Sequence, residues 1–543
     1  MRKIVTSLTC LLLLFLLALS INAATTDPIV DTKQGKVRGY FPNPTTRAFT
    51  GIRFASSTAG SNRFKPPINV ADVISPTIFN ATNYGNVCVQ SDSSGNNYDQ
   101  AQSEDCLFLN VWTPADANVT NKYPVFFWIH GGAFKYGTGN MYQGDYWTQV
   151  SQQVGSPIVV VTFNYRLGIL GFLSDSLFKT ENGLTTGNLG LLDQLSALTW
   201  VRKNIDNFGG DSSKITIGGE SAGGVSTLIL LTSPLLGKVK GAIAQSGSFL
   251  PWLIQQSVDD ANVISGKFKT AVGCSSLNCL RNLPTSTILS YQDGSTDLFV
   301  PVIDNYVTND TIYNNFLIGN YKQVPTIIGT TYNETTQWTC GYPSDLSSTA
   351  QRGVLNSVFG KDKVNTFWSS LPTYYPNVGY DNNLQYFNVY FSDAEMHCNA
   401  RHAASLFTKF VTKVYLYTFN YFIDYPLFDE TCYGASHATE LPFFFPSVMK
   451  VRLTSKFYTF TDEETNFSKQ LIRYWSNFIV SSNVNNNAAS SNLAADMVTW
   501  PAYTVCNNKR NMLKKGALSI TNNLYSTVCP FWNGITDFPV QTC

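Results

Sequence analysis

Two uninterrupted runs of β-branched and aromatic residues constrain the fold of this chain more than any other feature. Residues 125–129 read VFFWI and residues 158–163 read IVVVTF, without the polar–apolar alternation of a half-exposed strand. Such strands are buried on both faces, as in a parallel sheet covered by helices. Helix and strand patterns then alternate, with helices expected over 190–208 and 225–231 and a strand over 215–217. The pattern predicts an α/β fold whose large, mostly parallel central sheet is flanked by helices.

The domain count follows from composition rather than from length. A chain of 543 residues suggests three or four domains as a first guess. Charged residues make up only 13% of it, against about 25% in a typical globular protein, and no repeat or shift in composition marks a boundary. Further strands are expected over 242–244, 326–328 and 414–419. We therefore predict one α/β domain over residues 24–543.

The first 23 residues have the pattern of a secretory signal peptide. Arg2 and Lys3 precede an apolar stretch over 11–19, and small or polar residues follow as far as Ala23. No later segment offers the roughly 20 consecutive apolar residues of a membrane span. We predict a signal peptide over residues 1–23 and no membrane anchor. The mature protein is expected in the lumen of the secretory pathway or, as the favoured location, outside the cell.

Cysteines and sequons agree with that compartment. Removing Cys10 with the signal leaves ten of the eleven cysteines, an even number that suits disulfide pairing. No pair of C-x-x-C motifs is present, so no metal site is expected, and nothing in the sequence indicates a cofactor. Asn-x-Ser/Thr sequons predict glycosylation at four positions, Asn80, Asn118, Asn309 and Asn466. A fifth sequon, at Asn333, adjoins a candidate active-site residue, where a glycan is not expected.

The net charge excludes one class of partner. The chain carries 37 Lys and Arg against 36 Asp and Glu, a formal charge of +1. A protein that binds nucleic acid through phosphates needs a basic excess or a basic cluster, and neither occurs. We expect no nucleic-acid partner.

The chemistry is predicted at the turn after residue 217. Gly219-Glu220-Ser221-Ala222-Gly223 is a G-x-S-x-G motif between a predicted strand and a predicted helix. In that context the glycines permit a tight turn that projects the serine hydroxyl above the sheet. The motif predicts that Ser221 is a catalytic nucleophile.

A nucleophilic serine needs a base, and the chain has only four histidines. His130 precedes two glycines and is expected to shape that loop, whereas His397 and His402 flank Cys398 in a predicted helix and are expected to be structural. His437 lies among small residues in a loop well after a predicted strand, where this architecture places its base. We predict His437 as the general base.

The third member of the site should be a carboxylate between Ser221 and His437 in chain order. Asp304 and Glu334 are the two candidates. Glu334 follows the predicted strand 326–328 and is favoured, whereas Asp304 is expected to cap a turn. The carboxylate would hold the imidazole in one tautomer and stabilise its charged form.

Small residues after the first buried strand predict an oxyanion hole. The segment His130-Gly131-Gly132-Ala133-Phe134 allows backbone N–H groups to face a substrate carbonyl. We predict donors from Gly132 and Ala133, together with the N–H of Ala222.

Seven further blocks of sequence accompany these motifs in a fixed order. They are GIRFA at 51–55 with Arg63-Phe64, SEDCLFLN at 103–110, NYRLG at 164–168, GNLGLLDQ at 187–194, QSGS at 245–248, FVPVID at 299–304 and WPAY at 500–503. From about residue 31 to residue 532 the chain resembles the type-B carboxylesterase family, which includes the cholinesterases. The resemblance implies an α/β-hydrolase fold and a triad that falls on Ser221, Glu334 and His437.

The same resemblance implies three disulfides, Cys88–Cys106, Cys274–Cys279 and Cys398–Cys529. Cys340, Cys432, Cys506 and Cys543 remain. A Cys340–Cys432 bridge would tie the Glu334 and His437 loops together, while Cys543 is left to pair with Cys506 or with another chain. The oligomeric state stays open.

Departures from the cholinesterases bear on the substrate, a small-molecule ester. Cholinesterases carry a Trp in the first disulfide loop, but residues 89–105 contain none. Gln337 stands where they often have an aromatic residue, although Trp338 follows, and Ser295 and Asp297 replace their acyl-pocket aromatics. We therefore predict a secreted serine esterase acting on neutral, fairly apolar esters. The alternatives are cholinesterase or lipase specificity, or a non-catalytic adhesion or storage protein, which would usually lack part of the triad.

Overall fold

The computed structural model describes residues 27–535, except for 73–76, 92–99, 250–254, 412, 424–433, 450–457 and 486–496. The predicted signal peptide, Cys432 and Cys543 therefore lie outside the described residues.

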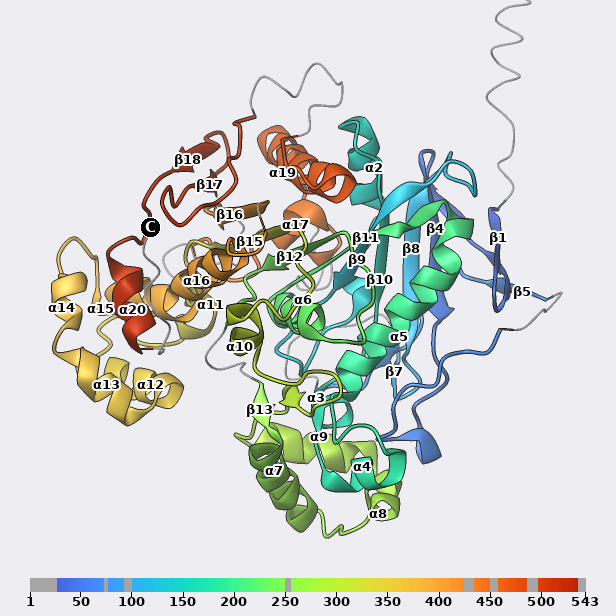
Figure 1. Cartoon of the computed structure of the whole chain (residues 1–543), viewed down its shortest axis with the longest axis horizontal. Coiled ribbons are helices and arrows are strands. Elements are labelled where there is room, and N and C mark those ends of the chain that lie inside the picture. Colours follow the sequence, from blue (N-terminus) through green and yellow to red (C-terminus); the bar gives the residue numbers. More distant parts are fainter. Residues whose placement is uncertain are drawn as a thin grey trace, which may run out of the picture.

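The centre of the molecule is an eleven-stranded sheet (Figure 1). Its seven central strands, from β10 to β17, are parallel, and the strands on both flanks run antiparallel to their neighbours. In spatial order the strands are β18 (Ser519–Thr521), β17 (Arg510–Leu513), β16 (Val414–Phe419), β15 (Thr326–Thr331), β12 (Gly241–Gln245), β11 (Gly210–Glu220), β9 (Tyr123–Ile129), β10 (Val159–Phe163), β8 (Phe108–Pro114), β4 (Thr46–Arg53) and β3 (Tyr40–Asn43). The predicted α/β class and mostly parallel sheet are confirmed.

Helices cover both faces of the sheet, which explains the apolar runs of the sequence. In β9, Val125, Phe127 and Ile129 join one hydrophobic core, whereas Phe126 and Trp128 join another on the opposite face. The first core includes α5 (Leu189–Asn204), α6 (Ala222–Thr232) and α16 (Cys398–Phe407), and the second includes α2 (Asp145–Gln153), α17 (Leu441–Phe444) and α19 (Asp462–Ser481). Because both faces are buried, alternate strand positions must both be apolar.

A third hydrophobic core lies beside the sheet. It joins α12 (Ser348–Phe359), α13 (Lys361–Trp368), α14 (Leu371–Tyr374), α15 (Asn383–Ser392) and α20 (Val528–Ile535), which form a group at the left of Figure 1. A π-helical segment, Asp393–His397, connects α15 to α16.

Apart from the 14-residue α7, the remaining strands and α-helices have ten residues or fewer. They are β1 (Ile29–Thr32), β2 (Gly35–Arg38), β5 (Ile78–Asn80), β6 (Val87–Cys88), β7 (Gln102–Ser103), β13 (Gln256–Ser257), β14 (Val302–Ile303), α3 (Gly168–Phe172), α4 (Ser176–Asn182), α7 (Val258–Ala271), α8 (Leu277–Asn282), α9 (Thr285–Gly294), α10 (Ile312–Leu317) and α11 (Thr336–Thr339). Within the described ranges, no helix has the length and apolar character needed to cross a membrane.

Two element boundaries differ from the expectations by four residues or more. The predicted helix 190–208 is α5 followed by a 3₁₀ turn, Ile205–Phe208, and the predicted strand 215–217 is the buried end of the longer β11. The polar residues in the first half of β11 hid its start, because that half is largely accessible to solvent.

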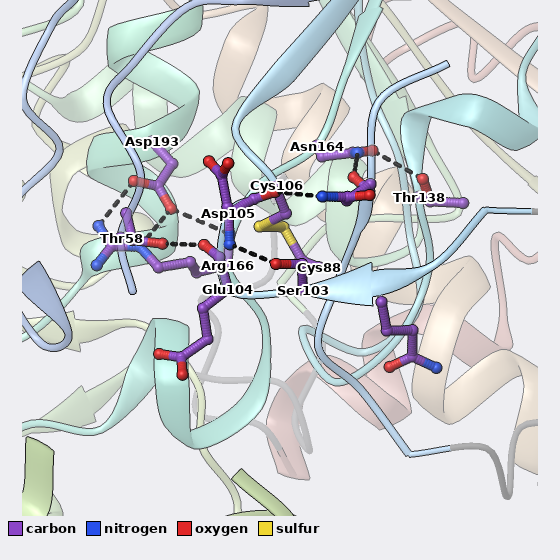
Figure 2. The surroundings of a disulfide bond; sticks show 12 residues. Thr58, Cys88, Ser103, Glu104, Asp105, Cys106, Thr138, Asn164, Arg166 and Asp193 are labelled. Atoms are coloured by element: carbon purple, nitrogen blue, oxygen red, sulfur yellow. Dashed lines mark hydrogen bonds and ion pairs between the residues drawn. A yellow bond between two sulfur atoms is a disulfide. The ribbon is translucent and has the colours of Figure 1, made fainter. Parts of the chain in front are cut away.

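Three disulfides stabilise the connections, with the pairing that the family resemblance implies. Cys88–Cys106 joins β6 to the segment before β8, Cys274–Cys279 closes a short loop after α7, and Cys398–Cys529 ties α16 to α20. Figure 2 shows the first of them, with Asp105 drawn between this disulfide and the buried Arg166–Asp193 ion pair. Cys340 is also disulfide-bonded, and Cys506 is free and exposed.

Candidate active site

Ser221 occupies a strained turn between β11 and α6. Its backbone adopts φ 56° and ψ −125°, a conformation that most residues avoid. Gly219 and Gly223 make the turn possible: a Cβ at these positions would lie 2.3 Å and 2.0 Å from the Ile129 carbonyl oxygen. The G-x-S-x-G motif thus reflects close contact with strand β9. The serine that it presents at the carboxyl end of the sheet is buried but lines a cavity.

The structure brings His437 and Glu334 into direct contact. His437 Nδ1 lies 2.6 Å from Glu334 Oε2, and the His437 backbone N–H donates to the Glu334 carbonyl at 3.3 Å. Glu334 follows the end of β15 by three residues and is fully buried. A carboxylate in this position orients the imidazole ring and favours the tautomer with its proton on Nδ1.

The second carboxylate oxygen of Glu334 is held by two donors. Glu334 Oε1 accepts hydrogen bonds from the Ser246 hydroxyl at 2.7 Å and from the Thr331 N–H at 2.8 Å. Sequence reasoning did not assign a role to Ser246, although it belongs to the QSGS block at 245–248. Ser246 directly follows β12, which is adjacent to β15 in the sheet, and this adjacency brings it to Glu334. Predicting the contact from the sequence would have required knowledge of the strand order.

A further carboxylate faces the other ring nitrogen. His437 Nε2 lies 3.1 Å from Glu220 Oε1, and the ring packs edge-on against Trp338, with centroids 5.2 Å apart. Within the described part of the chain, no hydrogen bond joins the ring to the Ser221 hydroxyl. Glu220 is the variable position of G-x-S-x-G, and its role was not predicted.

These carboxylates set the charge of the ring. Burial favours the neutral imidazole, but the negative charges of Glu220 and Glu334 outweigh it and raise the pKa of His437 to about 9. Burial alone would raise the pKa of Glu334, but the charge and hydrogen bond of His437, with the Ser246 hydrogen bond, hold it below its ordinary value. Burial, followed by repulsion from Glu220 and Glu334, raises the pKa of Glu440. The site therefore stabilises an imidazolium.

The other histidines lie in structural surroundings. His130 stacks on Tyr165, with centroids 4.3 Å apart, and its Nδ1 contacts the Gly131 carbonyl, while burial lowers its pKa to about 4. His397 contacts the Thr330 hydroxyl, and burial lowers the pKa of both His397 and His402 to about 4. None of the three lines the cavity with Ser221.

Asp304, the other candidate carboxylate, is occupied elsewhere. Its Oδ1 accepts from the N–H groups of Tyr306 and Val307 at 3.0 and 2.8 Å, and its Oδ2 accepts from Thr185. It caps the turn that follows β14, in agreement with the sequence-based expectation.

The glycine-rich loop after β9 lies against Ser221. Gly132, Ala133 and Phe134 have φ values of 107°, 53° and 58°, and a Cβ on Gly131 would lie 3.1 Å from Ser221 Cβ. In the residues that the structure describes, the N–H groups of Gly132 and Ala133 make no hydrogen bond. They are available to an oxygen atom bound beside Ser221.

A cavity of about 390 Å³ opens over these residues. The glycine-rich loop forms one side, and α11, α12 and Phe391 contribute another. Its lining residues are Gly131, Gly132, Ala133, Tyr136, Gly137, Met141, Tyr142, Glu220, Ser221, Gln337, Trp338, Thr339, Tyr342, Val354, Val358, Phe391, His437, Ala438 and Leu441. Most of them are apolar, as in sites for small organic ligands.

The positions that depart from the cholinesterases divide into two groups. Gln337 and Trp338 line the cavity. Ser295 and Asp297 are not among its lining residues; instead the Ser295 hydroxyl and Lys267 Nζ both bond Asp297, at 3.1 and 2.8 Å.

The doubly covered parallel sheet, with a serine on the strand–helix turn at its carboxyl edge, defines an α/β-hydrolase fold. Solved structures of similar shape include a "thermophylic PNB esterase", with a TM-score of 0.77 and 28% identity over 93% of this chain and all of that one. A PNB esterase has a TM-score of 0.75 and 28% identity over 92% of this chain and 98% of its own.

Comparison of sequences identifies the family within the α/β-hydrolase fold. The profile described as the carboxylesterase family matches residues 26–532, and the chain belongs to this family. The chain is 30% identical to acetylcholinesterase of Electrophorus electricus, over 96% of this chain and 90% of that protein. It is 29% identical to carboxylesterase 5A of Felis catus, over 96% of each. The protein is a carboxylic ester hydrolase.

Proposed function

We propose that the protein hydrolyses carboxylic esters through an acyl-enzyme on Ser221, with His437 as general base and Glu334 as its orienting carboxylate. The observation that carries the proposal is the His437–Glu334 contact of 2.6 Å beside a serine that lines the same cavity. Ser221 Oγ attacks the acyl carbon while His437 takes its proton and then protonates the leaving alcohol. Water activated by the same ring releases the acid.

Charge on the attacked carbonyl oxygen is stabilised by backbone donors. We assign these to Gly132, Ala133 and Ala222, of which the first two lie on the loop packed against Ser221. Each donor of this kind typically contributes about 10²–10³ in turnover.

In the resting arrangement His437 Nε2 faces Glu220, at 3.1 Å, and this contact must give way to one with Ser221. Catalytic hydrogen bonds often tighten only when substrate binds. The buried carboxylates then favour the imidazolium that forms as Ser221 attacks.

The lining of the cavity favours neutral, fairly apolar esters. Met141, Val354, Val358, Phe391 and Leu441 contribute apolar surface around the reacting serine. A net charge of +1 provides little long-range attraction for an ionic substrate.

We also propose that the chain is made with a signal peptide over 1–23, is secreted as a single domain over 24–543, and is glycosylated. The sequon residues Asn80, Asn118, Asn309 and Asn466 are exposed, which a glycan requires. Asn333 is only half-exposed, and its Oδ1 accepts a hydrogen bond from the Ala435 N–H at 3.1 Å, so we expect no glycan there.

Labelling with a fluorophosphonate, followed by peptide mapping, tests the nucleophile. We expect one adduct, on Ser221, and none in the Ser221→Ala variant, with Ser226→Ala, in the helix that follows Ser221, as the matched control. An adduct elsewhere, or none in the folded wild-type protein, would contradict the proposal. Phenyl esters of increasing chain length, assayed beside acetylthiocholine, then separate esterase, lipase and cholinesterase specificity.

A further inference from the structure

One side of the cavity carries a polar side chain whose hydrogen bonds are unmade. Gln337 lies on α11, three residues after Glu334, and lines the cavity next to Trp338. Among the residues that the structure describes, neither its Oε1 nor its Nε2 has a hydrogen-bond partner, and Oε1 is buried. Native proteins leave few buried carbonyl groups in this state, because the lost hydration is not replaced.

The neighbouring polar groups on this side of the cavity either have hydrogen-bond partners already or are accessible to water. The Thr339 hydroxyl is satisfied by the Thr335 carbonyl at 2.9 Å and by Asn388 Oδ1 at 2.5 Å. Tyr342 is 39% exposed, so water can reach its hydroxyl. Gln337 is therefore the polar group of this side that a bound molecule can satisfy with the greatest gain.

Its orientation is free to adapt to that molecule. Because no hydrogen bond fixes either end of the carboxamide, rotation about its last bond exchanges the C=O and NH₂ groups. One rotamer offers a donor to the cavity and the other offers an acceptor. A carbonyl, an amide or a hydroxyl on the ligand would each find a partner.

Apart from Trp338, Thr339 and Tyr342, the other residues that line this region of the cavity are apolar. Val354 and Val358 lie one turn apart on α12, and Phe391 lies near the end of α15. Their side chains are hydrocarbon and cannot form hydrogen bonds. A polar group with unmade hydrogen bonds in a largely apolar lining orients a ligand and selects between ligands of similar shape.

We infer that Gln337 is a specificity-determining residue: it hydrogen-bonds a second polar group of the ester, separate from the scissile carbonyl. The preferred substrates are thus esters with an otherwise apolar body that carries one carbonyl, amide or hydroxyl. This inference rests on the proposed function, since the ester must be bound at Ser221.

Matched pairs of esters test it, with the polar group on either half of the substrate. Phenyl 5-oxohexanoate and phenyl 5-methylhexanoate differ by a carbonyl oxygen against a methyl group in the acyl half, and 5-oxohexyl and 5-methylhexyl butanoate differ likewise in the alcohol half. The quantity measured is the polar-to-apolar ratio of kcat/KM, compared between the wild-type protein and Gln337→Met. The intrinsic chemical reactivity of each ester cancels, because the wild-type protein and the variant are assayed with the same pair of esters.

We expect the ratio to be about 3–10-fold higher in the wild-type protein for at least one pair, which is the worth of one neutral hydrogen bond. Gln337→Leu repeats the test with a second apolar side chain if Gln337→Met does not fold. Gln323→Met, at an exposed glutamine outside the cavity lining, should leave the ratio unchanged.

A ratio equal in wild-type protein and variants for both pairs would overturn the inference, provided that all of them hydrolyse phenyl acetate. If the wild-type protein fails to hydrolyse phenyl acetate, the proposed function is wrong instead. The two failures are therefore distinguishable.

Discussion

Replacing Glu220 by Gln should shift the pH dependence of catalysis to lower pH. In the proposed mechanism the His437 ring must be neutral to accept the serine proton, and a pKa of about 9 leaves about 1% of the resting protein in that form at pH 7. The largest favourable influence on the charged ring is the Glu220 carboxylate, 3.1 Å from Nε2. The substitution removes that charge and keeps the size of the side chain.

The separation sets the scale of the shift. Two unit charges 3.1 Å apart interact by about 5 kcal/mol at an effective dielectric constant of about 20. One pKa unit corresponds to about 1.4 kcal/mol. Water and the new amide carbonyl recover part of the loss, so we expect the pKa of His437 to fall by about one to two units.

The assay is the pH profile of kcat/KM for phenyl acetate between pH 5 and 10, which reports the ionisation of the free enzyme. The ascending limb of Glu220→Gln should lie about one to two pH units below that of the wild-type protein. Glu181→Gln, at a carboxylate paired with Arg281 outside the cavity, removes an equal charge and should leave the limb in place. Coincident limbs in wild-type protein and Glu220→Gln would refute the electrostatic reasoning.

Four further predictions concern the candidate active site and the stability of the fold. Ser246→Ala removes a donor to the Glu334 carboxylate, worth about 1.5–3 kcal/mol for a charged acceptor, and should lower kcat about tenfold or more with little change in KM; an unchanged kcat would contradict this role. Gly223→Ala places a Cβ 2.0 Å from a backbone oxygen and should reduce the free energy of unfolding by about 3 kcal/mol, measured by urea denaturation. The Cys398→Ser/Cys529→Ser pair opens a bridge across 131 residues and should cost about 2–5 kcal/mol by the same measurement. Because the pKa of His437 is raised on folding, its contribution to stability is complete below about pH 6.5 and is lost as pH rises through about 9; His437→Gln should flatten that part of the stability–pH curve.

Local sequence patterns were sufficient for the parts of the fold that depend on local order. The unalternating runs at 125–129 and 158–163 predicted buried parallel strands, because residues on both faces of β9 had to be apolar. The turn at Ser221 could be predicted because its glycines and its strand–helix context lie within a few residues of one another. The start of β11 could not, since most residues of its first half are polar and partly accessible to solvent.

The candidate site was predictable only where each residue carries its own signal. His437 emerged by elimination among four histidines, and Glu334 by its distance from a strand. Ser246 and Glu220 were missed because their effect depends on spatial neighbours. Ser246 reaches Glu334 because β12 and β15 are adjacent in the sheet, an order that no sequence pattern specifies.

Three carboxylates from separate parts of the chain converge on the His437 ring. Glu220 ends β11, Glu334 lies in the loop after β15 and Glu440 in the loop before α17. The charges of Glu220 and Glu334 contribute most to the raised pKa of the buried ring, and Glu440 raises it further when it is ionised. Placing several like charges in a buried site is costly, and here the cost is reduced because one ring pairs with two of them and burial favours the protonated form of the third. The same arrangement that would stabilise the imidazolium during the proposed attack favours the charged form of the resting ring at neutral pH. In the proposed mechanism, catalysis at pH 7 therefore requires that the Glu220–His437 contact weaken when the ester binds. The fit of the ester to the cavity, including the proposed contact with Gln337, then affects the rate as well as the affinity.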